Sequence, residues 1–368
     1  MKILLYISSL TSGGAEKVAS MMADYWAEKH NIILLTDSFP KDDFFKVNKK
    51  VKRVSTGFKV SEKRLFRKLL LHFSGLKHLR TVIRKEDPDV IISHMDVTNV
   101  RVLLATMGLN VPVIVEDHNN PEMKGMPQPW KFLKPLTYKY AYNIVLLTKD
   151  LLNYYPKNLY DHNKIVFIPN PLNIPVEKSH SNEYILKNPT FIALGSLTDQ
   201  KGFDILLRVF KKVLKKKPEW HLTILGEGPK RAALEKLSIE LGIENNVFMP
   251  GRVKNPYSIL KEADIYVMSS RYEGFPVALC EAMGVGLPCI SFNCPTGPAD
   301  IIIHNKNGLL IDYLNEEKLA NAMADLIENP EIRKKFSKEA LKINETLNIN
   351  NIMHKWNKLI CDSISERN

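Results

Sequence analysis

The chain has 368 residues, a formal net charge of +12 and a hydrophobic content of 45%, values that suit a two-domain soluble protein with buried cores. No apolar run approaches the roughly 20 residues that a membrane-spanning helix requires. The apolar start of the chain runs directly into Gly13-Gly14, which favours a buried first strand over a signal peptide. The four cysteines follow no metal-ligand spacing, so we expect reduced thiols in the cytoplasm.

The first half of the chain alternates between short apolar runs and amphipathic stretches. Strands are expected at residues 3–7, 32–36, 90–93, 113–116, 144–147 and 166–168, and helices at 16–29 and 64–85. Strand, helix, strand repeats predict a parallel sheet that is covered on both faces. The Pro/Asn segment at Asn170 and the polar stretch that follows to Asn188 indicate a linker.

A second alternating set follows the linker. Strands are expected at residues 191–194, 220–225, 247–249, 265–268 and 288–292, and helices at 203–215, 230–241, 316–328, 331–345 and 350–365. We therefore predict an α/β protein with two Rossmann-like, doubly wound parallel-sheet domains that face each other across a cleft, at residues 1–172 and 173–349. Ligands of such sheets bind at the carboxyl ends of the strands.

Positive charge is concentrated between Lys41 and Lys85. This segment has 15 Lys or Arg and three acidic residues, and the difference equals the net positive charge of the whole chain. Apolar residues recur there at helical spacing, and a break is expected near Ser74-Gly75. The pattern predicts a basic amphipathic helix, which is either a domain helix with a solvated face or a contact to an anionic membrane surface. The candidate membrane-facing residues are Arg64, Arg67, Lys68, Lys77 and Arg80.

Two carboxylates bracket a Gly-Phe-Pro turn and the start of an apolar helix, in the segment from Glu273 to Glu281. Pro276 suits the first helical position, and the unpaired N–H groups of the first turn would then form an anion site for a diphosphate. A carboxylate at Glu281, among apolar residues, needs a partner, which sugar hydroxyls would supply. The alternative is a loop acid at Glu273 and a lysine pair for Glu281. A nucleotide-sugar fits both ends of the segment.

Other motifs lie where ligands of parallel sheets bind. Gly13-Gly14 follows the first strand but lacks the GxGxxG spacing of NAD-binding loops. Lys201 follows strand 191–194 and could neutralise a leaving diphosphate, and His118 follows strand 113–116 and could donate to a sugar or a phosphate. Asp87-Pro-Asp89 precedes a strand, so we interpret it as a structural turn, and we expect no metal site.

Over nearly all of its length the chain resembles retaining glycosyltransferases of family four, which have the GT-B fold. The resemblance rests on Gly13-Gly14-Ala15-Glu16, Lys201-Gly202, Gly226-Glu-Gly-Pro229, Pro250-Gly251-Arg252, Ser270-Arg-Tyr-Glu-Gly-Phe-Pro-Val-Ala-Leu-Cys-Glu-Ala-Met283 and Cys294-Pro-Thr-Gly-Pro298. The last two are typical of the branch that builds O-antigen, capsule or lipid-linked oligosaccharide. The resemblance also implies that the C-terminal helix, residues 350–368, returns to the first domain.

The resemblance implies roles for individual residues. Glu273, Lys201 and His118 would be catalytic, with Lys201 at the leaving phosphate and His118 at the transferred sugar. The donor-binding set would be Gly14, Ser196, Arg252, Val253, Gly274, Phe275, Pro276, Val277 and Glu281, the last holding the ribose. Ser196 departs from the family, which commonly has Arg there as a second phosphate-binding cation. Arg252, Arg271 or a nearby lysine could replace that charge.

The implied reaction is transfer of a hexose or N-acetylhexosamine, with a galactose or N-acetylgalactosamine type favoured, from a UDP-sugar to an undecaprenyl-diphosphate saccharide. We expect no cofactor, no metal and no nucleic-acid partner. The protein would be cytoplasmic and peripherally attached to the inner face of the cell membrane through its basic helix and through Trp130, Phe132, Tyr138 and Tyr140. The alternatives are a sugar-nucleotide epimerase of similar fold and a basic protein that binds nucleic acid or membrane without catalysis.

Overall fold

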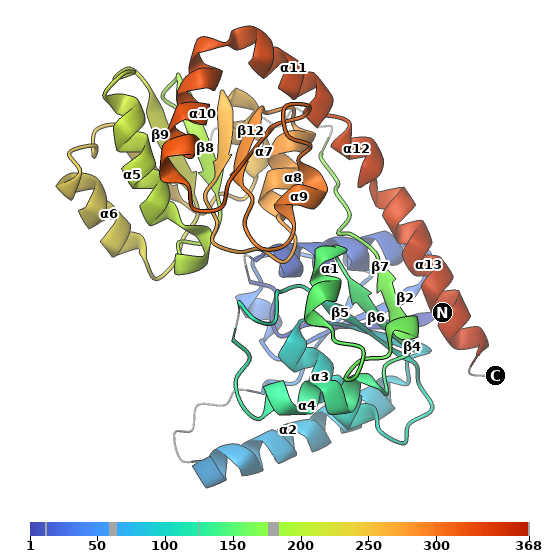
Figure 1. The fold of residues 1–368 in the computed structure, drawn as a ribbon. Coiled ribbons are helices and arrows are strands. Elements are labelled where there is room, and N and C mark those ends of the chain that lie inside the picture. Colours follow the sequence, from blue (N-terminus) through green and yellow to red (C-terminus); the bar gives the residue numbers. More distant parts are fainter. Residues whose placement is uncertain (12, 59–64, 124, 176–183, 367–368) are drawn as a thin grey trace. The chain divides into compact units, whose positions relative to one another are not determined.

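The computed structural model describes residues 1–11, 13–58, 65–123, 125–175 and 184–366 (Figure 1). Arg64 lies outside these residues, as do the side chains of Arg67 and Lys68. The chain forms two compact units, Met1–Asn170 with Asn350–Asn368, and Pro171–Ile349. The functions assigned above to these parts of the chain stay predictions.

The first unit contains a seven-stranded parallel sheet in the order β3-β2-β1-β4-β5-β6-β7. The strands are β1 (Lys2–Tyr6), β2 (Asn31–Thr36), β3 (Lys52–Ser55), β4 (Val90–His94), β5 (Val113–Asp117), β6 (Asn143–Leu146) and β7 (Ile165–Phe167). Its helices are α1 (Gly14–Trp26), α2 (Leu65–Glu86), α3 (Asp96–Thr106), α4 (Trp130–Tyr138) and α13 (Ile349–Ser365). The strand order reverses between β1 and β4, which makes their carboxyl ends the ligand-binding crest of such a sheet.

The basic segment of this unit differs from the sequence-based expectation in two ways. The short edge strand β3 lies inside the basic segment and has no strong apolar signal. Helix α2 runs without a break through Gly75. A Cβ at Gly75 would lie 2.3 Å from Cε2 of Phe58, so glycine there allows the Phe58 ring to pack against a continuous helix.

The C-terminal helix α13, drawn in red in Figure 1, belongs to the first unit, as predicted. The indole Nε1 of Trp26 on α1 donates to Oδ1 of Asn357 at 2.7 Å. The ring of Trp356 packs edge-on against Trp26, with the centroids 6.3 Å apart. Since both indoles are fully buried, residues from opposite ends of the chain share one core.

The second unit contains a six-stranded parallel sheet in the order β10-β9-β8-β11-β12-β13. The strands are β8 (Thr190–Leu194), β9 (His221–Leu225), β10 (Val247–Gly251), β11 (Ile265–Met268), β12 (Cys289–Phe292) and β13 (Leu309–Ile311). The helices are α5 (Phe203–Leu214), α6 (Arg231–Glu240), α7 (Pro256–Glu262), α8 (Val277–Gly284), α9 (Pro298–Ile301), α10 (Glu316–Glu328), α11 (Pro330–Ala340) and α12 (Ile343–Thr346). The order of this sheet reverses between β8 and β11.

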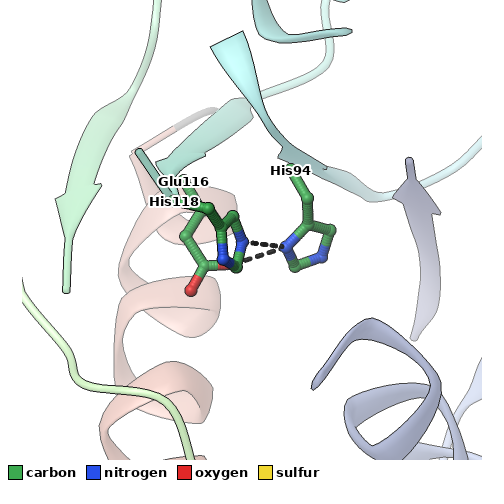
Figure 2. A group of neighbouring side chains, drawn as sticks. All are labelled: His94, Glu116 and His118. Carbon is green, nitrogen blue, oxygen red and sulfur yellow. Dashed lines mark hydrogen bonds and ion pairs between the residues drawn. The ribbon is translucent and has the colours of Figure 1, made fainter. Parts of the chain in front are cut away.

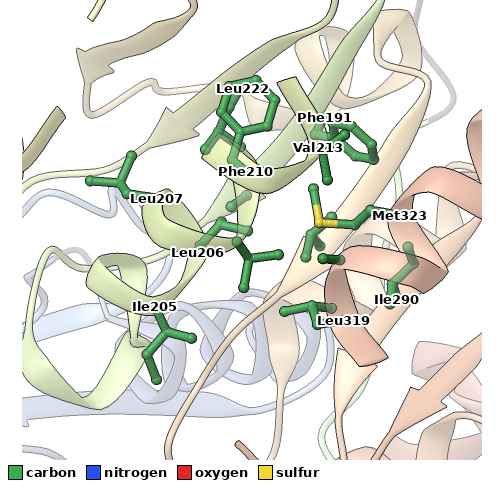
Figure 3. Close-up of a cluster of buried hydrophobic side chains, with 14 of the residues drawn as sticks. Phe191, Ile205, Leu206, Leu207, Phe210, Val213, Leu222, Ile290, Leu319 and Met323 are labelled. Atoms are coloured by element: carbon green, nitrogen blue, oxygen red, sulfur yellow. The ribbon is translucent and has the colours of Figure 1, made fainter. Parts of the chain in front are cut away.

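Apolar side chains from helices and strands form the core of the second unit (Figure 3). Phe210 of α5 and Met323 of α10 are fully buried with Phe191 of β8. Because α5 places its apolar residues on one face, burying that face against the sheet stabilises the helix and fixes the loop that precedes it.

In both units an aspartate side chain accepts a hydrogen bond from the first backbone N–H of a neighbouring strand. Oδ2 of Asp89 accepts from the backbone N–H of Lys2 at 2.7 Å, and Oδ2 of Asp264 accepts from the N–H of Thr190 at 2.8 Å. Each aspartate thus joins the starts of the two strands that flank the reversal of its sheet. The Asp87-Pro-Asp89 segment therefore has the structural role that was predicted.

Among the residues that the structure describes, no helix combines the length and apolar composition needed to cross a bilayer.

Candidate active site

The crest of the second sheet brings together two residues that the sequence singled out. Nζ of Lys201 lies 2.6 Å from Oε1 of Glu273, and the hydroxyl of Ser270 donates to the same oxygen at 2.6 Å. The Glu273 side chain is 5% exposed, whereas that of Lys201 is 20% exposed, so the lysine is the more accessible member of the pair. The pair lies at the β8/β11 reversal, where sheets of this kind bind ligands.

Gly202 allows this close approach of two loops. It has a φ of +62°, and a Cβ there would lie 2.2 Å from the carbonyl oxygen of Ser269. The hydroxyl of Ser269 donates to the carbonyl of Lys201 at 3.0 Å. Any other residue at position 202 would push the Lys201 loop away from the strand end that leads to Glu273.

Arg271, one of the predicted replacements for the missing arginine at Ser196, already has a partner. Its Nη1 and Nη2 donate to Oδ1 and Oδ2 of Asp204 at 2.9 and 2.8 Å. Burial raises the pKa of Asp204, but Arg271 and Arg208 more than offset this and lower it to about 2. Arg252 is exposed directly after β10, and Arg271 is a weaker candidate for the second cation than Arg252.

The turn before α8 differs from the expectation at one residue. Pro276 occupies the N-cap, and the helix begins at Val277, whose N–H donates to the carbonyl of Phe275 at 2.9 Å. The amide of Val277 is therefore not an outward, unpaired donor, and the predicted anion site loses one group. The amides of Ala278 and Leu279 stay in the first turn, where helical N–H groups lack partners within the helix.

The Cys294–Pro298 loop supports this turn. The hydroxyl of Thr296 donates to the carbonyl of Glu273, and the N–H of Glu273 donates to the carbonyl of Pro295 at 3.2 Å. Gly297 has a φ of +98°, and a Cβ there would lie 2.6 Å from Cδ of Pro276. The last two motifs of the resemblance, Ser270–Met283 and Cys294–Pro298, are therefore one structural element, in which the loop holds Glu273 and Pro276.

Glu281 lies on α8 and is 3% exposed. The hydroxyl of Tyr257, on α7, donates to its Oε1 at 3.1 Å. The sequence analysis missed Tyr257, because a tyrosine after Asn255-Pro256 carries no signal beyond the start of a helix. An ionised carboxylate only accepts hydrogen bonds, and Tyr257 is one donor to it.

The crest of the first sheet holds a buried cluster of His94, Glu116 and His118 (Figure 2). Nε2 of His118 lies 3.0 Å from Oε2 of Glu116 and 3.2 Å from Nδ1 of His94, which also contacts Oε2 of Glu116. His118 was predicted, whereas His94 and Glu116 were not. The available signal was the pairing of parallel strands, because His94 ends β4 and is the register partner of Glu116, one residue before the end of β5.

These ionisable groups change one another's proton affinity. Burial acts to raise the pKa of Glu116, but His118 and His94 more than offset it, and the pKa is held well below its usual range. Burial acts to lower the pKa of His118, but the Glu116 carboxylate more than offsets it, and the pKa is raised. The two side chains therefore form an ion pair over a wide pH range. Two imidazoles and a carboxylate are also metal-ligand types, but hydrogen bonds already account for their arrangement.

A second buried network surrounds Asp117, the neighbour of His118. Nζ of Lys134 lies 2.8 Å from Oδ2 of Asp117 and 2.6 Å from Oδ1 of Asp96. The hydroxyl of Tyr138 donates to Oδ1 of Asp117 at 2.7 Å, and that of Tyr155 contacts Oδ2. This network fixes the end of β5 from the side opposite to the histidines.

Gly14, predicted to approach the donor, is the first residue of α1, and Gly13 is its N-cap. A Cβ at Gly13 would lie 2.1 Å from Oε2 of Glu16. The glycine therefore lets the Glu16 carboxylate fold back over the start of its own helix, where its charge adds to those that raise the pKa of His118.

The candidate membrane-facing residues differ in their surroundings. Lys77 on α2 is exposed. The Arg80 guanidinium instead donates to the carbonyls of Ala105 and Met107, each at 2.7 Å, at the end of α3. Arg80 is therefore a weaker candidate for contact with lipid than Lys77, because its guanidinium already caps a helix C-terminus.

The large apolar and aromatic residues of the segment 130–140 include buried and exposed members. Trp130 and Tyr138 are buried, whereas Phe132 is 67% exposed, Leu136 47% and Tyr140 53%. The exposed residues follow one another at intervals of four and form an apolar stripe on α4 and its end.

Two parallel-sheet Rossmann-like units with crests of this kind define an α/β protein of the GT-B type. Structural neighbours agree on the fold. They include a mutant of S. aureus TarM in complex with fondaparinux, α-GlcNAc-glycerol and UDP (TM-score 0.81, 16% identity, 98% of this chain and 99% of that chain). Another is the Anabaena protein HepE in complex with UDP and glucose (TM-score 0.81, 17% identity, 98% and 99%).

Sequence comparison gives the family. A family model described as Glycosyltransferase Family 4 matches residues 12–174, and one described as Glycosyl transferases group 1 matches residues 176–343. An uncharacterized glycosyltransferase of Methanocaldococcus jannaschii is 32% identical over 79% of this chain and 84% of its own. The chain belongs to this family of glycosyltransferases.

A further relative has a described activity. It is an α-1,4-N-acetyl-D-galactosaminyltransferase of Campylobacter jejuni, whose name gives a saccharide attached to diphospho-undecaprenol. It is 27% identical over 98% of this chain and 99% of its own.

Proposed function

We propose that this glycosyltransferase moves a hexose or N-acetylhexosamine from a UDP-sugar to an undecaprenyl-diphosphate saccharide, with retention of anomeric configuration, in surface polysaccharide biosynthesis. Relatives support the acceptor class. Two Campylobacter jejuni relatives are N-acetylgalactosaminyltransferases whose names give undecaprenol-linked saccharides. An Erwinia amylovora relative is an amylovoran biosynthesis glycosyltransferase. They favour a galactose or N-acetylgalactosamine type of donor. UDP is favoured because several structural neighbours are complexes with UDP.

The observation that carries the proposal is the Lys201–Glu273 pair at the β8/β11 reversal. A departing diphosphate needs positive charge where its negative charge develops, and the partly exposed Lys201 ammonium offers it. When the diphosphate binds, the Lys201 ammonium would leave Oε1 of Glu273 and contact a phosphate oxygen instead. Glu273, still held by Ser270, would then lie beside the sugar and accept from its hydroxyls.

The rest of the donor would also bind to the second unit. The turn Gly274–Val277, the amides of Ala278 and Leu279 and Ser196 would surround the diphosphate, and Glu281 would accept from the ribose hydroxyls. The backbone of Arg252 and Val253 would contact the base. Lys201 and backbone amides supply the positive charge in this scheme, so the proposal includes no metal and no cofactor. In the first unit, His118 would contact the transferred sugar and Gly14 would lie close to the donor.

We place the protein at the inner face of the cell membrane, peripherally bound. Lys77 on α2 and the apolar stripe of Phe132, Leu136 and Tyr140 would contact anionic lipid. Lys131 and Lys139 flank the stripe and are exposed. Cations beside exposed apolar groups are the combination that holds a protein on an anionic surface.

The test is a transfer assay with defined products. Purified protein is incubated with UDP- and GDP-sugars, with and without a short-chain polyprenyl-diphosphate saccharide, and the linkage of each product is determined by NMR. We expect transfer from a UDP-hexose or UDP-N-acetylhexosamine with an α-linked product from the α-configured donor, unchanged by EDTA. A β-linked product would contradict retention. Conversion of UDP-sugar alone to an epimer, with no transfer, would favour the epimerase.

A further inference from the structure

The His94–Glu116–His118 cluster has a proton arrangement that its geometry determines. A single oxygen, Oε2 of Glu116, faces both Nε2 of His118, at 3.0 Å, and Nδ1 of His94. An ionised carboxylate only accepts hydrogen bonds, so each of these nitrogens must carry a hydrogen toward it. The two nitrogens, 3.2 Å apart, are then both donors to Glu116 and not partners of each other.

The remaining ring nitrogens are in different environments. Nε2 of His94 is buried and makes no hydrogen bond within the described residues. Nδ1 of His118 also has no hydrogen bond there, but it is not among the enclosed unpaired atoms, and the His118 side chain is 5% exposed. A second N–H on His94 would be buried without an acceptor, which is costly, so the extra proton of the pair is more stable on His118.

We infer that Glu116 and His94 are positioning residues for His118: they hold its ring with Nε2–H toward Glu116 and leave Nδ1 as the atom that a ligand meets. The charged groups around His118 come from three elements. Glu16 comes from α1, His94 ends β4, and Glu116 and Asp117 end β5. Lys134 offsets the charge of Asp117, so Glu116 is the acid that acts most directly on the ring.

This arrangement has a chemical consequence at the crest. When His118 carries its second proton, Nδ1–H is a charged donor that suits an oxygen of a sugar hydroxyl or of a phosphate. When the pH rises above the pKa of His118, Nδ1 becomes an acceptor and the positive charge is lost. The consequence for transfer rests on the proposed contact of His118 with the sugar, whereas the arrangement of the cluster does not.

The first experiment is therefore independent of activity. Protein labelled with ¹⁵N in its histidines is titrated by NMR, and His118→Gln assigns the His118 signals. We expect the neutral ring to carry its hydrogen on Nε2, and we expect Glu116→Gln to lower the midpoint of His118 by about one pH unit, a tenfold change in proton affinity. Glu86→Gln is the matched control, because Glu86 is a buried carboxylate of the same unit that pairs with Lys52 instead.

An unchanged His118 midpoint in Glu116→Gln, or a neutral ring with its hydrogen on Nδ1, would overturn the inference. Circular dichroism and thermal unfolding of each variant separate a loss of the fold from a loss of the carboxylate.

The second experiment measures the pH dependence of kcat/KM for transfer in wild type and Glu116→Gln. We expect the alkaline limb of the profile to follow the His118 midpoint, so it moves to lower pH in the variant. If the NMR midpoint moves and the kinetic profile does not, the positioning role stands and the contact with the sugar fails. If transfer itself is absent for every donor, the proposed function fails and the NMR result is unaffected.

Discussion

The two sheet crests share one plan and use charge in opposite ways. In both units an aspartate joins the starts of the strands that flank the reversal of the sheet. At the second crest, Lys201 and Glu273 form a pair in which the lysine side chain is 20% exposed. At the first crest, Lys134 is 4% exposed and lies between Asp96 and Asp117, which leaves its charge no access to a ligand. The comparison teaches that the same fold position can present a charge to a ligand or fix a strand end.

Replacing the same residue type in both units tests this comparison, and the largest effect is expected in the first. Lys134→Met leaves two carboxylates in the interior without their cation, which should destabilise the first unit by about 3–5 kcal/mol. Lys50→Met is the control, since Lys50 is 59% exposed and its partner Glu28 is 57% exposed, and it should cost less than about 1 kcal/mol.

Tryptophan fluorescence during urea unfolding measures this prediction. Trp26, Trp130 and Trp356 belong to the first unit and only Trp220 to the second, so a Trp220→Phe background reports on the first unit alone. Equal stability of Lys134→Met and wild type would show that the network is not a structural element.

Lys201→Met should show a smaller loss of stability than Lys134→Met and a large loss of rate, because Lys201 neutralises one buried carboxylate and Lys134 contacts two. Removing one preorganised charge from a developing anion lowers kcat by about 10²–10³-fold. The measurement is initial-rate kinetics with the donor identified above, beside Lys212→Met, which removes an exposed lysine of α5 that pairs with Glu317. A normal kcat in Lys201→Met would remove Lys201 from the mechanism.

The exposed apolar stripe extends the comparison to the outer surfaces of the units. Replacing Phe132 and Tyr140 by Ser should weaken binding to anionic vesicles by about tenfold or more, because each side chain contributes on the order of 1 kcal/mol when it enters the interface. Ile239→Ser in the second unit is the matched control, since Ile239 is 65% exposed and Phe132 is 67% exposed. Vesicle sedimentation measures the effect, and an equal loss in both variants would contradict a specific membrane-facing surface.

The sequence predicted the central strands well, because parallel strands buried on both faces have continuous apolar runs. It missed β3 and β13, which are short and partly exposed at sheet edges. It also missed α3, where buried polar residues such as Asn99 and Arg101 interrupt the apolar period. Arg101 pairs with Asp37, a contact between residues far apart in the chain.

The residues of the candidate site likewise include some that the sequence predicted and some that it missed. Lys201, Glu273 and Glu281 were found because glycine and proline mark the turns around them. Their partners Ser270 and Tyr257 depend on how loops and helices pack, which no local pattern encodes. His94 and Glu116 required the register of β4 and β5, and the predicted strand ended one residue before His94. Local motifs therefore located each crest, and tertiary packing determined which charges meet there.

The smallest effect is expected for Tyr257→Phe, which removes one hydrogen bond to Glu281 and keeps the ring. Such a bond contributes about 0.5–1.5 kcal/mol, so the donor KM should rise by about twofold to tenfold while kcat changes little. This split follows if Tyr257 orients Glu281 for the ribose, which is bound equally in the ground and transition states. Initial rates and UDP calorimetry measure it, with the exposed Tyr140→Phe as control. A fall in kcat with an unchanged KM would instead place Glu281 beside the reacting atoms. The second crest would then use a buried charge, on Glu281, as well as the partly exposed charge of Lys201 in catalysis.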